Sequence, residues 1–360
     1  MKIGIIGGGI FGVTIAIRLA KSHTVEIFEK NDDILKAGSD INQCRIHRGY
    51  HYPRSDTTAK ELLESQEDFV HEYKDAIITD TENYYCIAKE NSQTSADEYI
   101  KFCQRNNLEY RISKLDIVNE SKIDLCLKVN ENLLNHKKLK EICWQNLKEN
   151  NVKINLNQKV NEQIFENYDK IIICTYADSN ELLNKFPENQ FKAQFEICEK
   201  IFVKLPKSFH KKSILIMDGP FMSIDPVGET DLFIIGDVVH TVLSSNIGKK
   251  PELEKKFLDI LDRGIIINPP FTNFQSFIDS ATRFMPDASK AEHVGSSFCI
   301  KTVLANIDET DERPTVVRKI NDKIISVFSG KIPTCVNAAK KVEEIINQTI
   351  DTQNLKAKSI

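Results

Sequence analysis

The sequence predicts an α/β protein in two parts: one has a parallel sheet, and the other is an α+β domain with an antiparallel sheet. Three observations lead to this prediction. The 360 residues suit two closely packed domains better than a single core. The chain begins with a strand, a glycine-rich turn, a helix and a second strand, the order of a βαβ unit. Between 196 and 239, turn signals separate successive extended segments, as in an antiparallel sheet.

The composition is that of an ordinary globular protein, with 41% hydrophobic and 28% charged residues. A formal net charge of −4 argues against a nucleic-acid-binding surface, so we expect a small-molecule partner. No window approaches the ~20 apolar residues of an integral membrane segment. The N-terminus lacks the basic region and the cleavage site of a signal peptide. We therefore expect a cytoplasmic protein.

The nine cysteines are scattered along the chain, and no two of them form a C-x-x-C pair. Their number is odd, so neither a disulfide framework nor a zinc site is indicated, and we expect no metal. Buried thiols in a reducing compartment are the simplest interpretation.

The N-terminal unit has the order of a Rossmann-like nucleotide-binding motif. Lys2 to Ile6 form an isoleucine-rich run typical of a strand buried on both faces. Gly7 to Gly12 match G-x-G-x-x-G, and apolar residues then recur at helical spacing as far as Lys21. The next strand, Val25 to Phe28, leads directly into Glu29.

Each part of this motif has a physical role. Gly7 permits the tight turn, Gly9 lets the backbone approach a pyrophosphate, and Gly12 lets the helix lie close to the strand. Ile10 and Phe11 open the helix whose N-terminus would meet the phosphates. The carboxylate of Glu29, followed by Lys30, stands where it can accept hydrogen bonds from a ribose. The alternative is a glycine-rich turn that binds nothing.

The polar and aromatic segment from Ser39 to Pro53 carries a resemblance to a known family. With the preceding motif it resembles the D-amino-acid-oxidase-type FAD-dependent oxidoreductase superfamily, which includes glycine oxidase, 2-hydroxyglutarate dehydrogenase and FAD-linked glycerol-3-phosphate dehydrogenase. The resemblance implies FAD as the cofactor. It also implies that Ser39, Asn42, Arg45 and His47 touch FAD or line the edge of the flavin.

Later segments extend this resemblance. Val160 stands where the superfamily places a valine whose backbone meets the adenine. Tyr168 to Ala177 resembles the strand that ends beside the nucleotide, with Thr175 and Tyr176 at its end, although Cys-Thr-Tyr-Ala replaces Ala-Thr-Gly. The Arg-Pro element at 311–315 precedes a strand from Ile324 to Phe328, and the turn that follows would place Gly330, Lys331 and Ile332 under the flavin. Ser329 and Pro333 depart from the superfamily's G-G-K-x-T-T pattern.

This organisation predicts a discontinuous FAD-binding domain made of 1–70, 135–195 and 300–360. The substrate domain would consist of 71–134 and 196–299. Expected helices include 57–74, 139–147 and 251–263.

The predicted reaction is oxidation of a C–OH or C–NH bond of a small anionic substrate, with hydride transfer to flavin N5. Lys331 would stabilise charge on the flavin, and Arg313 would anchor the substrate through a bidentate guanidinium. His47 and His51 are candidates for proton transfer. Alternatives remain open for each: a solvated lysine, an ion pair of Arg313 with Asp311 or Glu312, and a structural hydrogen bond from His47 to the cofactor.

Three further residues are candidates for contact with the substrate. Tyr50 and Tyr52 would wall the cavity, unless they belong to the core. His240, after a predicted strand, would reach the cavity from the substrate domain, and an exposed or hydrogen-bonded ring is the alternative.

Three other functions compete with this prediction. A non-redox flavin-dependent isomerase or mutase would typically carry a second Gly-Gly pair soon after Glu29, where the sequence has only Gly38. An NAD-binding reductase would leave the Arg-Pro and Gly-Lys segments unexplained. A nucleotide-binding protein without catalysis is consistent with the departures at Ser329 and Pro333.

Overall fold

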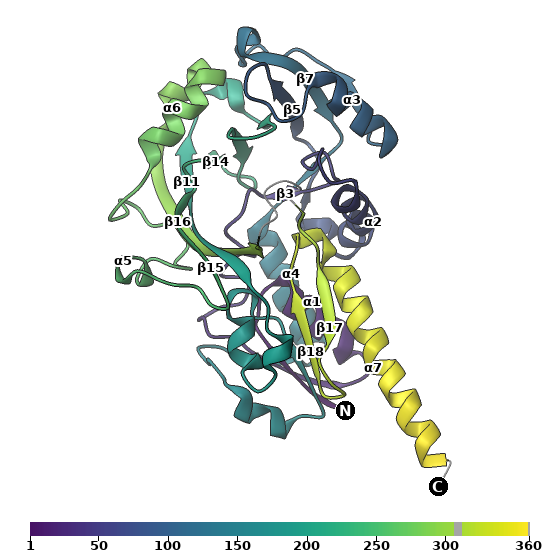
Figure 1. Ribbon diagram of the computed structural model, residues 1–360. Coiled ribbons are helices and arrows are strands. Elements are labelled where there is room, and N and C mark those ends of the chain that lie inside the picture. The colour runs from purple at the N-terminus through teal and green to yellow at the C-terminus, as the bar shows by residue number, and fades with distance from the viewer. Residues whose placement is uncertain (306–311, 359–360) are drawn as a thin grey trace.

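The computed structural model describes residues 1–305 and 312–358, with side chains up to residue 349. Two parts lie end to end (Figure 1). One contains the N-terminus and the long C-terminal helix, and the other lies at the opposite end of the molecule. In the described part of the chain, no helix is long and apolar enough to cross a membrane.

The first part is built on a six-stranded sheet with the order β17-β18-β10-β1-β2-β9. Five of the strands run parallel, and β17 is antiparallel to β18. The bounds are β1 Lys2–Ile6, β2 Thr24–Phe28, β9 Lys153–Asn155, β10 Lys170–Ile173, β17 Val316–Lys319 and β18 Ile324–Phe328. Strands distant in the sequence therefore meet β1, whose four residues Ile3 to Ile6 are buried.

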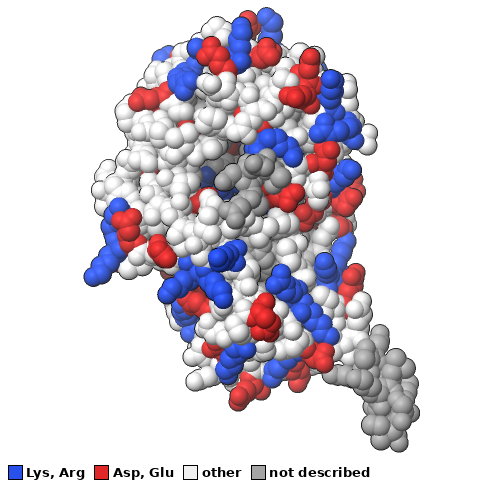
Figure 2. Space-filling view, viewed as in Figure 1, with Lys and Arg blue, Asp and Glu red and all other residues white. Residues whose placement is uncertain are grey.

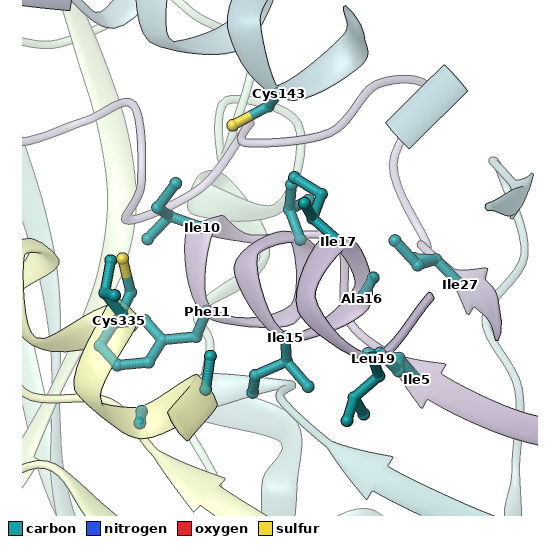
Figure 3. Close-up of a cluster of buried hydrophobic side chains, with 14 of the residues drawn as sticks. Ile5, Ile10, Phe11, Ile15, Ala16, Ile17, Leu19, Ile27, Cys143 and Cys335 are labelled. Carbon is teal, nitrogen blue, oxygen red and sulfur yellow. The ribbon is translucent and has the colours of Figure 1, made fainter. Parts of the chain in front are cut away.

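Helix α1 (Ile10–Ala20) is the centre of the core in this part (Figure 3). It is buried on nearly all sides, which explains a sequence that is apolar all round rather than on one face. Its side chains meet Ile5 and Ile27 from the strands. They also meet Cys143 of α4 (His136–Glu149) and Cys335 of α7 (Cys335–Lys358).

The second part is built on a nine-stranded sheet, in which β15-β11-β14-β13-β12-β5-β7-β6 follow one another and β16 also pairs with β11. The pairs are antiparallel except for β12 with β5. The strand bounds are β5 Glu82–Ala88, β6 Tyr110–Ile112, β7 Ile123–Val129, β11 Ala193–Lys204, β12 Lys212–Met217, β13 Met222–Pro226, β14 Leu232–Asp237, β15 Val242–Gly248 and β16 Glu292–Leu304. Helices α3 (Ala96–Arg105) and α6 (Phe274–Phe284) pack against this sheet.

A small third sheet connects the two parts. It contains β3 (Arg45–Ile46), β8 (Asn132–Leu134) and β4 (Ile77–Ile78), in that order. Helix α2 (Asp56–Glu72) follows β3 and lies beside the first part. Because β3 pairs with β8, which belongs to the segment expected in the substrate domain, segments of the two predicted domains interleave at this point.

Two predicted elements differ from the structure. The helix expected over 251–263 is limited to α5 (Lys255–Leu258), because Asp262 adopts a left-handed backbone with φ 58° and Leu261 bridges to Phe298 of β16. The strand expected over 168–177 ends at Ile173, and a 3-10 helix, Tyr176–Leu183, follows it. Asp262 and Tyr176, which lie at these two breaks, line the cavities described below.

Candidate active site

The turn between β1 and α1 is too tight for side chains. Gly7 has φ 105°, and a Cβ on Gly12 would overlap the carbonyl oxygen of Gly7. Gly9 caps the helix, and the N–H of Ile10 donates to Ser39 Oγ at 3.0 Å. The turn therefore presents the positive N-terminus of α1 to an open space, which is the arrangement that binds phosphate groups.

Glu29 is held at the end of β2 by the backbone. Its Oε2 accepts the N–H of Gly8 at 2.6 Å, and its Oε1 accepts the N–H of Asn31 at 2.8 Å. Each carboxylate oxygen has a second lone pair, so the fixed carboxylate can still accept hydroxyl donors from a ribose.

A cavity of about 180 Å³ lies at these strand ends and at the N-terminus of α1. Residues from segments far apart in the sequence line it. The predicted cofactor residues among them are Gly7, Gly9, Ile10, Phe11, Glu29, Lys30, Ser39, Val160, Thr175, Tyr176, Gly330 and Ile332. Gly12 lies behind the cavity, where it permits the close approach of helix and turn. Lys30 is paired with Asp178, with 2.7 Å between Nζ and Oδ2.

A second cavity, of about 710 Å³, adjoins the first. Tyr176, Ser329, Gly330 and Ile332 are among the residues that line both. The other predicted residues that line the second cavity are Asn42, Arg45, His47, His51, Tyr52, Arg313 and Lys331. Figure 2 shows a hollow in one face of the molecule, with Lys or Arg atoms visible inside it.

His47 and His51 lie side by side in the second cavity, with 5.4 Å between their ring centroids. Burial lowers the pKa of both imidazoles, and the positive charges of Lys331 and Arg45 act in the same direction, while Glu131 opposes them only in part at His47. Both rings are therefore neutral near pH 7. Nδ1 of His51 is buried without a hydrogen-bond partner in the part of the chain that the structure describes. A neutral imidazole of this kind can accept a proton from a substrate hydroxyl or amine.

The segments that contain Arg313 and Lys331 pack against each other. The N–H of Gly330 donates to Thr315 Oγ1 at 3.1 Å, and a Cβ on Gly330 would collide with the carbonyl of Arg313. The guanidinium of Arg313 donates to the carbonyl of Glu312 at 2.9 Å, and Asp311 lies outside the described residues. Nζ of Lys331 lies 5.3 Å from the centroid of the Tyr52 ring. Two cationic side chains thus line the same cavity as the two histidines.

The comparisons with known proteins agree with this geometry. The family model described as FAD dependent oxidoreductase matches residues 2–228. The chain belongs to this family. Its cofactor is FAD, and it is an enzyme.

Relatives cover almost the whole chain. The FAD-dependent monooxygenase FPY4 of Fusarium mangiferae is 22% identical and aligns with 96% of this chain and 91% of its own length. Glycine oxidase from Geobacillus kaustophilus superposes with a TM-score of 0.71 at 12% identity, over 96% of this chain and 94% of its own. L-α-glycerophosphate oxidase from Mycoplasma pneumoniae, solved with FAD bound, gives 0.72 at 14% identity over the same shares. The fold of this oxidoreductase is that of these enzymes.

The first cavity fits the nucleotide part of FAD. The cradle of Gly7, Gly9 and Gly12 leaves the helix N-terminus open to a pyrophosphate, and the oxygens of Glu29 are placed for a ribose. Tyr176 occupies the position where the resemblance expects glycine and adopts φ 53°. Its hydroxyl donates to the carbonyl of Thr302 and accepts that residue's N–H, both at 2.9 Å. These two bonds hold the unusual backbone at the boundary of the two cavities.

Two sequence predictions are corrected in this oxidoreductase. Tyr50 belongs to the core rather than to a cavity wall: it is 1% exposed, and its hydroxyl donates to the carbonyl of Glu109 at 2.6 Å. His240 does not line the second cavity, although its neighbour Thr241 does. Asp237 Oδ1 accepts the N–H of His240 at 2.8 Å, and the resulting turn directs the imidazole towards Phe277.

Arg45 interacts with two buried carboxylates that the sequence motifs did not indicate. Its Nε lies 2.8 Å from Asp225 Oδ1, and its Nη1 lies 3.4 Å from Glu131 Oε2. The Tyr85 hydroxyl donates to Glu131 at 2.6 Å. Burial acts to raise the pKa of Glu131, but His47 and Arg45 lower it below its usual value. The charge of Arg45 is therefore balanced before any ligand binds.

Asp262 and Lys200 were also missed. Asp262 lines the first cavity, and Lys200 lines the second. Each is separated by more than 100 residues from the N-terminal motif, and no local pattern marks it. The alternation of side chains along a strand could have shown which face of the sheet Lys200 occupies. It could not have shown that this face lines the second cavity.

Proposed function

We propose that this FAD-dependent oxidoreductase oxidises a C–OH or C–NH bond of a small anionic substrate held in the second cavity. The observation that carries the proposal is the position of two neutral imidazoles and two cations in a cavity that adjoins the cofactor cavity. Bound FAD supplies the acceptor for the hydride. The enzyme's own side chains must then orient the substrate and remove one proton.

In this proposal, Arg313 binds the anionic group of the substrate through its guanidinium, and Lys331 adds positive charge near the flavin. His51 accepts the proton of the substrate's OH or NH group, because its ring is neutral and buried. His47, 3.7 Å from Glu131 through Nδ1, is the second candidate for this role. The names of the glycine and glycerophosphate oxidases support an amine or an alcohol as the oxidised group.

We further propose the division into an FAD-binding domain (1–70, 135–195 and 300–360) and a substrate domain (71–134 and 196–299), and a cytoplasmic location. Nine free cysteines support a reducing compartment.

Anaerobic reduction tests the proposed function. The purified protein loaded with FAD is mixed without oxygen with hydroxy acids, amino acids and polyol phosphates, and the flavin absorbance is followed. We expect one class to bleach the flavin directly, and H51Q to slow this reduction while leaving the FAD spectrum intact. If NADH or NADPH bleaches the flavin and no substrate does, the enzyme is instead a monooxygenase, as the name of its Fusarium relative suggests. A flavin that none of these compounds reduces would support the non-catalytic alternative.

A further inference from the structure

Strand β11 presents alternate side chains to the second cavity. Glu196, Cys198 and Lys200 line the cavity, whereas Glu199 lies on the opposite face, where its carboxylate accepts the N–H of Asn273 at 2.9 Å. Lys200 is only 8% exposed. A buried ammonium group therefore faces the space in which the substrate is proposed to bind.

Three other basic side chains that line this cavity, those of Arg54, Lys301 and Arg45, are paired with carboxylates. Arg54 Nε lies 2.9 Å from Asp218 Oδ2, and Lys301 Nζ lies 2.8 Å from Glu196 Oε2. Arg45 is paired with two acids, as described above. Lys200, in contrast, makes no hydrogen bond or ion pair with any residue that the structure describes.

The groups around Lys200 do not compensate its charge. Burial has the largest effect on the pKa of its ammonium, and Lys301 acts in the same direction, whereas the Cys198 and Cys299 thiols and Asp225 oppose burial only in part. Burial lowers the pKa of Lys200, which means that the protein stabilises its charge poorly. Such a group is stabilised when an anion enters and pairs with it.

A second unpartnered donor lies beside Lys200. Ser297 of β16 is directly opposite Lys200 in the strand register and therefore shares its face of the sheet. Ser297 is not itself among the residues that line the cavity, but its Oγ is buried next to Lys200 and has no hydrogen-bond partner in the described residues. An ammonium and a hydroxyl on adjacent strands can together bind one carboxylate or phosphate group.

We propose that Lys200 and Ser297 form a second anion-binding subsite, so that the substrate is a small acid with two anionic groups. The inference rests on the proposed function, in which Arg313 binds the first group. Lys301 and Arg313 both lower the pKa of Glu196, which lies on the same face of β11 as Lys200. Arg313 and Lys200 thus line one cavity of about 710 Å³, a volume that accommodates a small acid with two anionic groups.

Binding of unreactive acids to the FAD-loaded enzyme tests this subsite. The probes are glutarate, adipate and pimelate, each compared with the straight-chain monocarboxylate of the same length, and affinity is read from the perturbation of the flavin absorption. A phosphate arm compares 3-phosphoglycerate with glycerate. We expect the wild-type enzyme to bind the best dianion at least about tenfold more tightly than its matched monoanion, the effect of one charge-assisted hydrogen bond.

K200M should reduce this preference to less than about twofold and leave monoanion affinity unchanged, since only the second contact is removed. The matched control is K204M. Lys204 lies on the same strand but is exposed and paired with Asp231, so this variant should retain the preference. S297A should weaken the preference partially.

An equal affinity of the wild-type enzyme for dianions and monoanions overturns the subsite, even if K200M fails to fold. A preference that survives in both K200M and K200Q also overturns it. Failure of the proposed function has a different signature, because dianions would then bind with the tenfold preference while no member of the substrate panel reduces the flavin.

Discussion

Replacing Asp262 by Asn should stabilise the protein that is free of FAD, and the effect should grow with pH. Burial is the largest cause that raises the pKa of Asp262 from 3.8 to about 6; Glu29 and Asp178 act in the same direction, while Lys30 opposes them. Between these values the folded state holds more protons than the unfolded state, so the free energy of unfolding falls as the pH rises through this window. A pKa difference of about 2 between the folded and unfolded states corresponds to roughly 3 kcal/mol in the free energy of unfolding. Because Asp262 is partly exposed to solvent, we expect an effect of about 2 kcal/mol.

Urea unfolding of FAD-free protein between pH 4 and 8, followed by the fluorescence of Trp144, measures this effect. We expect the D262N and wild-type free energies of unfolding to agree near pH 4 and to differ by about 2 kcal/mol, in favour of D262N, at pH 7. D259N removes the same charge from an exposed position in the same segment, so it should show no such divergence. A difference for D262N that stays constant across the pH range would refute the argument that an ionised carboxylate is buried there.

Three other substitutions test the site. R45M should lower the free energy of unfolding by about 3–5 kcal/mol, because it leaves Asp225 buried without its partner; a loss below 1 kcal/mol would contradict the buried ion pair. G12A should weaken FAD binding at least about tenfold by forcing α1 away from the turn. G248A is the control, because Gly248 lies outside both cavities and a new Cβ there meets its nearest atom at an ordinary 3.4 Å, so binding should be unchanged. R313A should raise KM about 10- to 100-fold with little change in kcat, and an unchanged KM would remove Arg313 as the anchor.

The nucleotide-binding part of the fold could be predicted because its signals are local. A buried strand, a glycine turn and an apolar helix lie within thirty residues, and the observed β1 has the predicted bounds. The two segments around Arg313 and Gly330 were inferred from resemblance, and they do pack together. The extended segments expected between 196 and 239 are also observed, as β11 to β14.

The remainder depends on contacts between distant residues. Glu131, in the turn between β7 and β8, and Asp225, in β13, reach Arg45 from positions far apart in the sequence, so neither stands out in its own segment. His240 follows a strand as predicted, but the Asp237 side chain caps the turn and directs the ring away from the cavity. The helix expected over 251–263 fails because pairing with β16 competes with helix formation near Leu261.

The pairing of β11 with β16 has a mechanical consequence. The two strands have 12 and 13 residues and stay paired from Ala193 with Leu304 to Lys204 with Glu292. Such a ribbon is stiff, because bending it would break backbone hydrogen bonds at several successive residue pairs. We therefore expect the wall of the second cavity that β11 and β16 form to keep its shape when a ligand binds, so that the substrate must fit a preformed wall.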